Sequence, residues 1–402
     1  MKNVLFVINT MGRAGAEIAM LELLRRIDPQ TCRVSLYVLM NQGELIKELP
    51  PYVRLLNRNC SDSSVFTPAG RFQLMKHTLR KMVYRNALMK NLGDLCGQFF
   101  GMLLRGRIRW DKLLWRVVSD GSEIFPEEYD LAVAFLEGGS TYYVADYVKA
   151  KRKVAFVHND HGQSGYNRKM DKNSYGEMDR IFTVSDEVRS TFLSVYPEYA
   201  ERVSVFHNII NWDRVRSSAR LDGGFTDGYA GIRLLTVGRL TEQKALELSV
   251  RAMKLLKAED IQARWYVLGE GPERAALSRL IRKLGLEQDF ILLGLSDNPY
   301  PYFRQADIYV HASRHEGKSI AVQEAMCLGC PVVLSDCSGN REQLTDGVDG
   351  VMCDLTAESI AEKVKMLIRN EEIRKRYGAA AAERNFISGE DVEMLLKICD
   401  QE

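Results

Sequence analysis

Residues 234–257 read LLTVGRLTEQKALELSVRAMKLLK, and this stretch decides the fold class. It opens with an apolar run at 234–237 and turns at Gly238. Apolar residues such as Leu246 and Val250 then follow with a period near 3.6 residues. Continuous apolar runs are typical of strands buried on both faces of a parallel sheet, and the longer period is typical of an amphipathic helix. The stretch therefore predicts the strand–turn–helix unit of an α/β fold.

The same alternation occurs twice along the chain. Apolar runs that predict strands lie at 4–8, 34–39, 131–136, 154–157, 181–184 and 203–206, and again at 234–237, 265–268, 290–293, 308–310 and 332–334. Between the two sets, residues 216–231 are rich in Ser, Gly and Asp, which is typical of a linker. We therefore predict two Rossmann-like domains with doubly wound parallel sheets, at 1–215 and 216–385, that face a central cleft.

The composition fits a two-domain globular protein. The chain has 402 residues, of which 46% are hydrophobic and 27% charged, and its formal net charge is +2. The length suits two domains, and the charge gives no general reason to expect a nucleic-acid partner. No apolar run approaches the roughly 18 residues of a membrane-spanning helix. The run at 4–8 lacks a signal-peptide cleavage site, so we expect a cytosolic protein.

The cysteines raise the question of a metal site. Eight of them are scattered through the chain, and Cys327 and Cys330 form a Cys-x-x-Cys pair. A structural zinc site usually needs a second pair nearby, and Cys327 lies in a run of helical character. We therefore expect free thiols that pack as small buried residues, and no metal.

Residues 60–125 interrupt the strand pattern of the first domain. Between Arg71 and Trp115, ten basic residues stand against two acidic ones, with apolar residues interleaved. This pattern predicts a basic, amphipathic helical insertion. Its interpretations are contact with an anionic membrane surface through about residues 71–116, a helical subdomain packed on its own apolar face, and nucleic-acid binding, for which no motif is recognisable.

The strongest cluster of candidate site residues follows the apolar run at 308–310. It reads SRHEGKSIAVQEAM over 313–326. A helix is expected to begin near Ser319, with Glu316 before it and Glu324 about two turns in. The unpaired N–H groups of a helix start suit a phosphate, and the two carboxylates can accept hydrogen bonds from hydroxyl groups of two different sugars. The alternative is one acid at a helix start and one solvated helix acid.

Two cations follow the apolar run at 234–237. Arg239 and Lys244 come after the turn and are expected at the carboxyl end of that strand. Together they can stabilise negative charge on a departing diphosphate; an exposed cationic loop is the alternative. A further sharp turn, GEGPE at 269–273, contains Glu270 and fits a loop that lines a nucleotide pocket.

Taken in order, these motifs resemble the donor domain of glycosyltransferase family four, the group 1 glycosyltransferases of the GT-B fold. The matching segments within 234–354 are VGRL with QK, LGEGPER, HEGKSIAVQEAM and CLGCPVVLSD. NPYPY at 298–302 resembles members that build bacterial surface polysaccharides. The resemblance implies the GT-B architecture and a C-terminal helix, at about 386–402, that packs back on the first domain.

The resemblance also implies roles for single residues. Arg239 and Lys244 would grip the donor diphosphate, Glu324 the ribose hydroxyl groups, and Glu316 the hydroxyl groups of the transferred sugar. The other residues implied in donor binding are Gly238, Glu270, Gly317, Lys318, Ser319 and Ile320, the last two through their backbone N–H groups. Members typically use a UDP- or GDP-sugar, need no metal or other cofactor, and retain the anomeric configuration.

Two further positions are implied in the first domain. His158, after the run at 154–157, resembles the family's cleft histidine and would bond the donor sugar or a phosphate; a loop histidine satisfied locally is the alternative. Gly12 and Gly15 resemble the acceptor-side loop after the first strand, although Ala14 replaces one of its glycines. Ala245 likewise replaces a glycine that often follows the lysine.

The sequence thus predicts a retaining, metal-independent hexosyltransferase. It would move a sugar from a nucleotide-diphosphate-sugar to a lipid-linked saccharide or polysaccharide acceptor, in the synthesis of a capsule, lipopolysaccharide, or other surface polysaccharide or glycolipid. Its expected location is the cytoplasm, peripheral on the inner face of the cell membrane. The alternatives are a phosphorylase or epimerase on the same scaffold, a non-catalytic sugar-binding or partner subunit, and a membrane-tethering scaffold.

Overall fold

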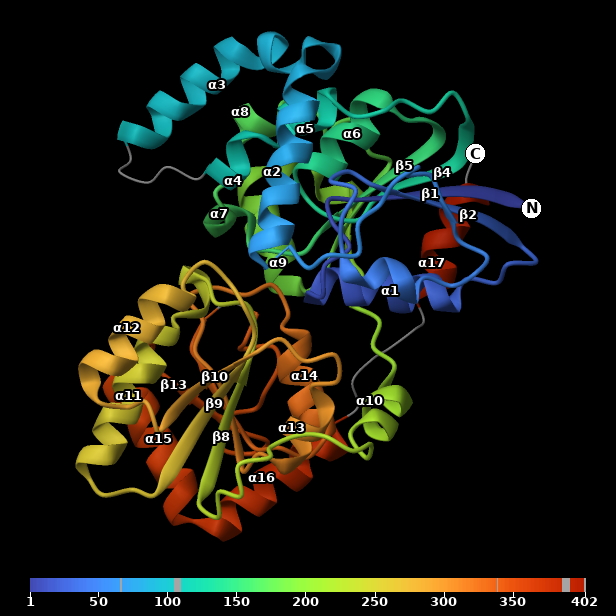
Figure 1. Ribbon diagram of the computed structural model, residues 1–402. Helices are drawn as coiled ribbons and strands as arrows, with labels where there is room; N and C mark the ends of the chain where they lie inside the picture. The colour runs from blue at the N-terminus through green and yellow to red at the C-terminus, as the bar shows by residue number, and fades with distance from the viewer. Residues whose placement is uncertain (66, 105–109, 338, 385–390, 401–402) are drawn as a thin grey trace. The chain divides into compact units, whose positions relative to one another are not determined.

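The computed structural model describes residues 1–65, 67–104, 110–337, 339–384 and 391–400. The chain divides into two compact units: unit 1 comprises Met1–Ile209 and Ser388–Glu402, and unit 2 comprises Ile210–Ile387. Each unit has a parallel sheet of its own (Figure 1). Each also has its own hydrophobic core.

Unit 1 contains a seven-stranded parallel sheet with the order β3-β2-β1-β4-β5-β6-β7. Its strands are β1 (Lys2–Ile8), β2 (Cys32–Val38), β3 (Arg54–Leu55), β4 (Glu128–Ala134), β5 (Lys149–Val157), β6 (Arg180–Thr183) and β7 (Val203–Val205). The order reverses between β1 and β4, and the carboxyl ends of strands at such a switch point are where ligands bind in open α/β sheets.

The sheet of unit 1 carries helices and short 3-10 turns. The helices are α1 (Gly15–Arg26), α2 (Pro68–Val83), α3 (Ala87–Leu104), α4 (Trp110–Leu113), α5 (Trp115–Asp120), α6 (Gly139–Tyr147), α7 (His161–Ser164), α8 (Arg168–Asp171), α9 (Asp186–Val195) and α17 (Asp391–Lys397). The 3-10 turns are η1 (Glu44–Glu48), η2 (Tyr84–Asn86), η3 (Pro197–Arg202) and η5 (Ile398–Asp400).

Unit 2 repeats the architecture with six parallel strands in the order β10-β9-β8-β11-β12-β13. They are β8 (Ile232–Val237), β9 (Ala263–Leu268), β10 (Phe290–Gly294), β11 (Ile308–His311), β12 (Val332–Ser335) and β13 (Val351–Cys353). The remaining elements are α10 (Trp212–Ser218), η4 (Glu242–Lys244), α11 (Leu246–Ala258), α12 (Arg274–Leu284), α13 (Tyr300–Gln305), α14 (Ile320–Cys327), α15 (Ala357–Arg369) and α16 (Glu371–Glu383). Helices α11, α12 and α15 form one layer, and α10, α13, α14 and α16 the other (Figure 1).

The predicted fold class is confirmed: both units are α/β with parallel sheets, and each predicted apolar run coincides with a strand. The predicted set lacked two strands, β3 and β13, which are two and three residues long. Such short strands give no recognisable apolar run, because they are held mainly by their pairing with β2 and β12.

The predicted linker at 216–231 is wrong in part. Its first residues, Arg216 to Ser218, belong to α10. Further along, Asp227 forms ion pairs with Arg233 (3.3 Å) and Arg264 (2.6 Å) of β8 and β9. Asp227 thus attaches the segment to the amino ends of β8 and β9. A polar composition alone does not distinguish an attached segment from a free linker.

The insertion of unit 1 is helical, as predicted, and consists mainly of α2, α3, α4 and α5. One of its cations does not face outward: Lys81 is buried and donates a hydrogen bond to Ser122 Oγ (2.7 Å). Burial lowers the pKa of Lys81 to about 8. Arg105, Arg107 and Arg109, which contribute to the predicted basic character, lie outside the described residues.

The described part of the C-terminus, α17 and η5, belongs to unit 1. Lys2 at the start of β1 donates to the Leu396 carbonyl (2.9 Å) and pairs with Asp400 (2.8 Å). Within the described residues, no helix combines the length and the apolar content that crossing a bilayer requires.

Candidate functional site

The two central strands of unit 2 bring the candidate residues to one edge of its sheet. β8 and β11 are neighbours at the point where the strand order reverses. Gly238 and Arg239 directly follow β8, His311 ends β11, and Glu316 follows β11. Because parallel strands end at the same edge, the loops after β8 and β11 meet at the switch point of the sheet.

Hydrogen bonds tie these two loops to each other. The Arg314 backbone N–H donates to the Gln243 carbonyl (2.8 Å), and the Gln243 side chain donates to the His315 carbonyl (2.8 Å). This reciprocal pairing holds Lys244 in position relative to Glu316 without the help of a ligand.

Ala245, next to Lys244, adopts a left-handed conformation with φ 44° and ψ 35°. A residue with a Cβ in this region costs about 1–2 kcal/mol relative to the right-handed one. The alanine therefore replaces the family's glycine at a position where the backbone itself favours glycine.

A buried ion pair forms the centre of the site. Lys244 Nζ lies 2.6 Å from Glu316 Oε1, and the exposed fractions of the two side chains are 14% and 7%. The alternative interpretation of Lys244 as part of an exposed cationic loop is therefore wrong. Burial by itself raises the pKa of Glu316, but Lys244 and His311 outweigh it and hold the pKa well below its ordinary value. Glu316 is thus an anion throughout the physiological range.

His311 was not among the predicted site residues. Its Nε2 lies 3.1 Å from Glu316 Oε1 and its Nδ1 3.1 Å from the hydroxyl of Tyr309. Burial, and then Lys244, lower the pKa of His311, so the ring is neutral. A carboxylate only accepts hydrogen bonds, so the proton is on Nε2. In the sequence, the one feature that points to His311 is that an ionisable residue directly follows a buried apolar run.

Glu324 lies on α14, a little over one turn from its start rather than two. It is buried, with 6% of its surface exposed, so the interpretation as a solvated helix acid is wrong. Tyr300 donates a hydrogen bond to its Oε1 (3.0 Å). Burial raises the pKa of Glu324 to about 7, although Tyr300 and Arg214 act in the opposite direction.

Between the two glutamates, α14 begins at Ile320 with Ser319 as its N-cap residue, as predicted. No side chain caps this end, although Ser319 is buried. The first backbone N–H groups of the helix therefore have no intrahelical acceptor and suit an anion. Gly317 is buried and Lys318 half-buried in the segment that leads to the helix.

The turn that contains Glu270 packs on the loop after β8. The backbone N–H of Leu240 donates to the Glu270 carbonyl (3.0 Å), and Gly238 N–H to the Leu268 carbonyl (2.9 Å). Gly269 has φ +149°, and a Cβ there would lie 1.9 Å from the Gly238 carbonyl oxygen, so only glycine fits. The carboxylate of Glu270 is engaged by Arg274 (2.6 Å).

Arg239 differs from Lys244. Its side chain is exposed, and its guanidinium has no hydrogen bond or ion pair with another described residue. The structure thus brings Lys244, Glu316 and His311 into direct contact. The guanidinium of Arg239, which lies on the same loop as Lys244, stays exposed.

In unit 1, His158 follows β5 and is buried. Its ring packs against Phe135 and Phe156, and one nitrogen bonds to the backbone of Phe135. Nε2 is buried without a hydrogen-bond partner in the described part of the chain, so the bonded nitrogen is Nδ1 and only that nitrogen is satisfied locally. Burial lowers the pKa of His158 to about 4, which leaves a neutral ring with an acceptor lone pair on Nε2.

The acceptor-side glycines show no special geometry. Neither Gly12 nor Gly15 has a positive φ, and a Cβ on Gly12 would be in ordinary van der Waals contact with Val65. Ala14 is the N-cap residue of α1. The backbone of this loop therefore does not itself require glycine.

Four of the eight cysteines pack in the interior of unit 2, whereas Cys96 of unit 1 is exposed, unlike the buried position expected. Cys327, Cys330, Cys337 and Cys353 are buried free thiols. The described residues contain no group of three or more His, Cys, Asp or Glu side chains placed to hold a metal ion.

Comparison with known proteins finds a family match within unit 2. Residues 231–384 match the family described as "Glycosyl transferases group 1". The chain is 31% identical over 193 residues to the N-acetylgalactosamine-N,N'-diacetylbacillosaminyl-diphospho-undecaprenol 4-alpha-N-acetylgalactosaminyltransferase of Campylobacter jejuni, which covers 48% of this chain and 50% of that protein. It is 28% identical over 233 residues to the amylovoran biosynthesis glycosyltransferase AmsD of Erwinia amylovora, covering 57% and 63%. The chain spans about half the length of the curated relatives it matches.

Solved structures with the same fold cover the whole chain. Anabaena HepE in complex with UDP-glucose superposes with a TM-score of 0.67 at 14% identity and covers 100% of this chain and 98% of that one. Staphylococcus aureus TarM gives a TM-score of 0.66 at 13% identity and covers 99% of both. The resemblance to glycosyltransferase family four and its GT-B fold is confirmed.

The raised pKa of Glu324 predicts a pH-dependent stability. Because the folded chain binds this proton more tightly than the unfolded chain, the carboxyl group lowers the free energy of unfolding as pH rises from about 4.5 to about 7. Glu324→Gln removes this titration. The melting temperature of the variant, relative to the parent, is expected to be several degrees higher at pH 8 than at pH 5.

Glu362→Gln, on an exposed position of α15, is the matched control and should show the same offset at both pH values. A pH-independent offset for Glu324→Gln would contradict the buried, titrating carboxyl group.

Proposed function

We propose that this chain, a group 1 glycosyltransferase by its residues 231–384 and by its GT-B fold, transfers a sugar from a nucleotide-diphosphate-sugar to an acceptor in surface polysaccharide or glycolipid synthesis. The observation that carries the proposal is the buried Lys244–Glu316 pair beside the start of α14. A cation, an anion and free helix N–H groups at one sheet edge match a diphosphate linked to a hydroxyl-rich sugar.

The cations would act on the leaving group. Breaking the glycosidic bond leaves a second negative charge on the diphosphate, and the ammonium of Lys244 and the first N–H groups of α14 stabilise it. Arg239, on the same loop, supplies a fork for the outer phosphate oxygens. The charge is thus stabilised by the chain's own groups.

Glu316 would hold the transferred sugar. Since Lys244 Nζ and Glu316 Oε1 are 2.6 Å apart, a phosphate bound by the lysine and a hydroxyl group bound by the glutamate belong to adjacent parts of one molecule. Glu324 would accept the hydroxyl protons of the ribose. Those donors favour the ionised carboxylate, which offsets the effect of burial on its pKa.

His158 of unit 1 would contact a hydroxyl group rather than a phosphate. Its Nε2 is a buried acceptor, and a phosphate oxygen, which also accepts, gives no favourable bond with it. A sugar hydroxyl, as donor, does. Retention of the anomeric configuration, transfer of a hexose and the roles of Gly12 and Gly15 on the acceptor side are proposed from the family resemblance.

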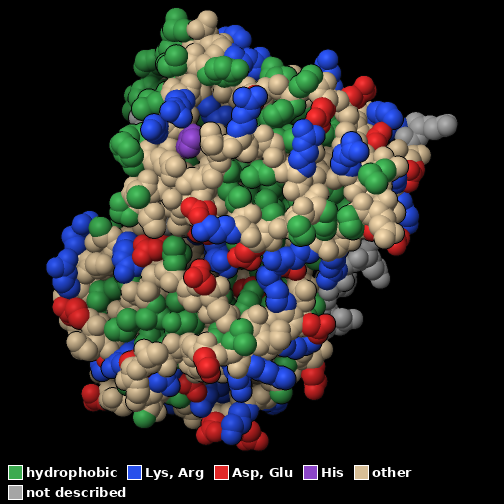
Figure 2. Space-filling model, turned by 45° about the vertical axis from the view of Figure 1, so that its right-hand side comes forward, with side chains coloured by type: hydrophobic (Ala, Val, Ile, Leu, Met, Phe, Trp, Pro, Cys, Tyr) green, Lys and Arg blue, Asp and Glu red, His purple; other side chains and the backbone are tan. Residues whose placement is uncertain are grey.

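We further propose a lipid-linked acceptor at a membrane surface. The Campylobacter relative is named for a diphospho-undecaprenol substrate. In unit 1, α2 and α3 expose large apolar side chains: Phe72, Met75, Leu79, Val83, Met89, Leu92, Phe100 and Leu103. Figure 2 shows hydrophobic side chains gathered beside Lys and Arg at the end of unit 1 that carries α3. A helical subdomain packed only on itself would bury these residues, whereas a helix lying in an anionic bilayer surface exposes them.

Activity tests the central pair. Glu316→Gln and Lys244→Ala are expected to lower kcat for sugar transfer, or for donor hydrolysis, by about 100-fold or more, because each removes a charge that acts on the donor. Radiolabelled UDP- and GDP-sugars with membrane extract as acceptor provide the assay. Glu362→Gln and Lys254→Ala, at exposed positions of unit 2, are matched controls that should retain activity.

Normal turnover by both central variants would contradict the proposal. Donor binding without transfer or hydrolysis by the parent chain would instead favour a non-catalytic sugar-binding subunit.

His311 is expected to act as a positioning residue for Glu316. His311→Phe removes its hydrogen bond to the carboxylate and should lower kcat about tenfold or more with little change in the donor KM. His311→Gln, whose amide can both donate to Glu316 and accept from Tyr309, should restore most of kcat. Equal loss in both variants with equal loss of melting temperature would indicate a role in folding alone.

The exposed apolar face of α3 predicts membrane binding. The double variant Met89→Ser, Phe100→Ser should bind phosphatidylglycerol-containing vesicles about tenfold or more weakly in a sedimentation assay, because two apolar side chains no longer enter the interface. Leu221→Ser, Val348→Ser, at exposed positions of unit 2, is the control. Unchanged vesicle binding by the α3 variant would contradict this proposal and leave the donor site unaffected.

A further inference from the structure

A buried carboxylate of unit 1 lies beside His158 and takes no part in the proposed donor contacts. Glu137, with 4% of its surface exposed, comes after β4, and His158 comes after β5. The two strands are parallel neighbours with Ala134 opposite Ala155, so the same register, continued by three residues, places residues 137 and 158 side by side. A buried carboxylate is costly unless hydrogen bonds compensate it, so its partners indicate its role.

The carboxylate of Glu137 binds two consecutive residues after β5. Its Oε2 accepts a hydrogen bond from the backbone N–H of His158 (3.0 Å), and its Oε1 accepts one from the side-chain amide of Asn159. The chain after Glu137 turns away at once, because Gly138 has φ +84° and α6 begins at Gly139. A side chain, and not a backbone carbonyl, therefore holds the start of the loop after β5.

The ring of His158 is held from the same side. It packs against Phe135, which directly follows β4, with 5.1 Å between the ring centroids, and its Nδ1 bonds to the Phe135 backbone. Phe156 of β5 also contacts it, at 6.1 Å. The backbone N–H and Nδ1 of His158 are thus both bound to residues at the end of β4, which determines the direction of the ring. Nε2, buried and without a partner in the described part of the chain, is left for a ligand.

The backbone of Glu137 is itself attached to the centre of the sheet. Its carbonyl accepts a hydrogen bond from Asn9 Nδ2 (3.4 Å), and Asn9 Oδ1 accepts one from the Ser140 N–H in the first turn of α6 (2.9 Å). Asn9 directly follows β1, which pairs with β4 at the point where the strand order reverses. The carboxylate of Glu137 therefore starts from a fixed position and does not belong to a mobile surface loop.

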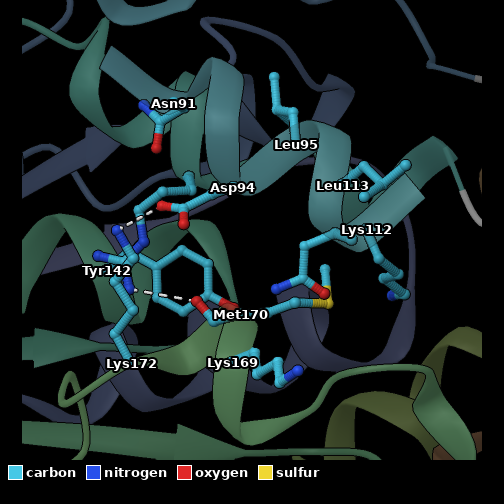
Figure 3. A pocket seen from close by; sticks show the side chains of 11 residues that line it. Asn91, Asp94, Leu95, Lys112, Leu113, Tyr142, Lys169, Met170 and Lys172 are labelled. Carbon is cyan, nitrogen blue, oxygen red and sulfur yellow. Dashed lines mark hydrogen bonds and ion pairs between the residues drawn. The ribbon is translucent and has the colours of Figure 1, made fainter. Parts of the chain in front are cut away.

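The far end of the loop after β5 is anchored as well. His161 begins α7, and its Nε2 lies 3.0 Å from Asp171, which is fully buried at the end of α8. Asp171 also accepts hydrogen bonds from the hydroxyl groups of Tyr142 (2.7 Å) and Tyr196 (2.6 Å). Tyr142 belongs to α6, and its ring lines a pocket together with side chains of α3, α4 and α8 (Figure 3). Residues 158–160 thus lie between two buried carboxylates that fix both ends of the loop.

The charge of Glu137 also suits an uncharged group at His158. Burial lowers the pKa of His158 to about 4, against the opposing effect of the nearby Glu137 charge. A negative charge beside a neutral ring makes its nitrogen a better acceptor and disfavours the approach of a phosphate. Both effects favour a hydroxyl group as the partner of Nε2.

We propose that Glu137 is a positioning residue for sugar binding: it holds residues 158–159 so that Nε2 of His158 meets a hydroxyl group of the donor sugar. The inference rests on the proposed function, since it explains how the proposed sugar contact of His158 obtains its direction. Glu137 itself has no contact with the donor. A glutamine can do the same work, because its oxygen can accept from the His158 N–H and its amide can donate to the Asn159 oxygen once that side chain turns over.

A double-mutant cycle on the full chain tests this role. Glu137→Met keeps the length of the side chain but accepts neither hydrogen bond, and should lower kcat/KM for the donor about tenfold. His158→Phe keeps the ring packing and removes Nε2, and should cost about the same. The double variant should be no slower than either single variant, because both remove one interaction. Glu137→Gln should keep most of the activity. Glu128→Met, the same change at an exposed position of β4, is the control and should match the parent.

A second measurement separates positioning from damage to the fold. The affinity for UDP or GDP, whichever is the nucleotide of the active donor, should stay unchanged in every variant, because neither carries the sugar that His158 contacts. Should Glu137→Met fail to fold, Asn159→Ala, which removes one of the two hydrogen bonds, should give a smaller loss of kcat/KM that disappears in the His158→Phe background.

A double variant about 100-fold slower than the parent would mean that Glu137 and His158 act independently and would overturn the proposal. So would full activity of His158→Phe, equal losses in Glu137→Gln and Glu137→Met, or weakened nucleotide binding in Glu137→Met. With an active parent, each of these results contradicts the role of Glu137 and leaves sugar transfer intact. A parent that neither transfers nor hydrolyses any sugar nucleotide contradicts the proposed function and this inference together.

Discussion

The ion pair of Lys244 and Glu316 is the constraint on which the candidate site of unit 2 depends. An unpaired carboxylate with 6% of its surface exposed would be too costly to keep charged, so the lysine must lie beside it. That requirement explains the local structure around it. The loops after β8 and β11 bond to each other through Gln243 and Arg314. Ala245 keeps a left-handed backbone that brings the lysine into place at an energetic cost.

Glu316 and Glu324 lie on either side of the start of α14 and are equally exposed, but their pKa values are shifted in opposite directions. Glu316 has a lysine and a histidine within hydrogen-bond distance, and its pKa is lowered. Glu324 has the hydroxyl of Tyr300, which is a weaker stabiliser of the anion, and its pKa is raised to about 7. Glu316 is a permanent anion, which is the charge state that its proposed contact with the transferred sugar needs. The other gains its charge most readily when a ligand supplies hydroxyl donors.

Unit 1 combines a buried polar position with an apolar surface. His158 offers a single acceptor nitrogen in a hydrophobic setting, and the contact with a hydroxyl group proposed above follows from that. The insertion instead turns large apolar side chains of α2 and α3 outward. The proposed sugar-nucleotide donor and amphiphilic acceptor would require these two kinds of surface.

The sequence by itself determined the α/β class, the main strands, the start of α14 and the helical nature of the insertion, because apolar period and helix-start signals act over a few residues. Only the tertiary structure decided which polar groups meet. His311, Tyr300 and the network around Asp171 are brought together by strand order and helix packing, with partners up to dozens of residues away. Lys81 is buried, whereas other cations of the same helix are exposed. The local sequence pattern does not distinguish a buried lysine from an exposed one. The sequence determines which polar and titratable side chains the chain contains. The packing around the sheets determines which of them become neighbours and which charge state they adopt.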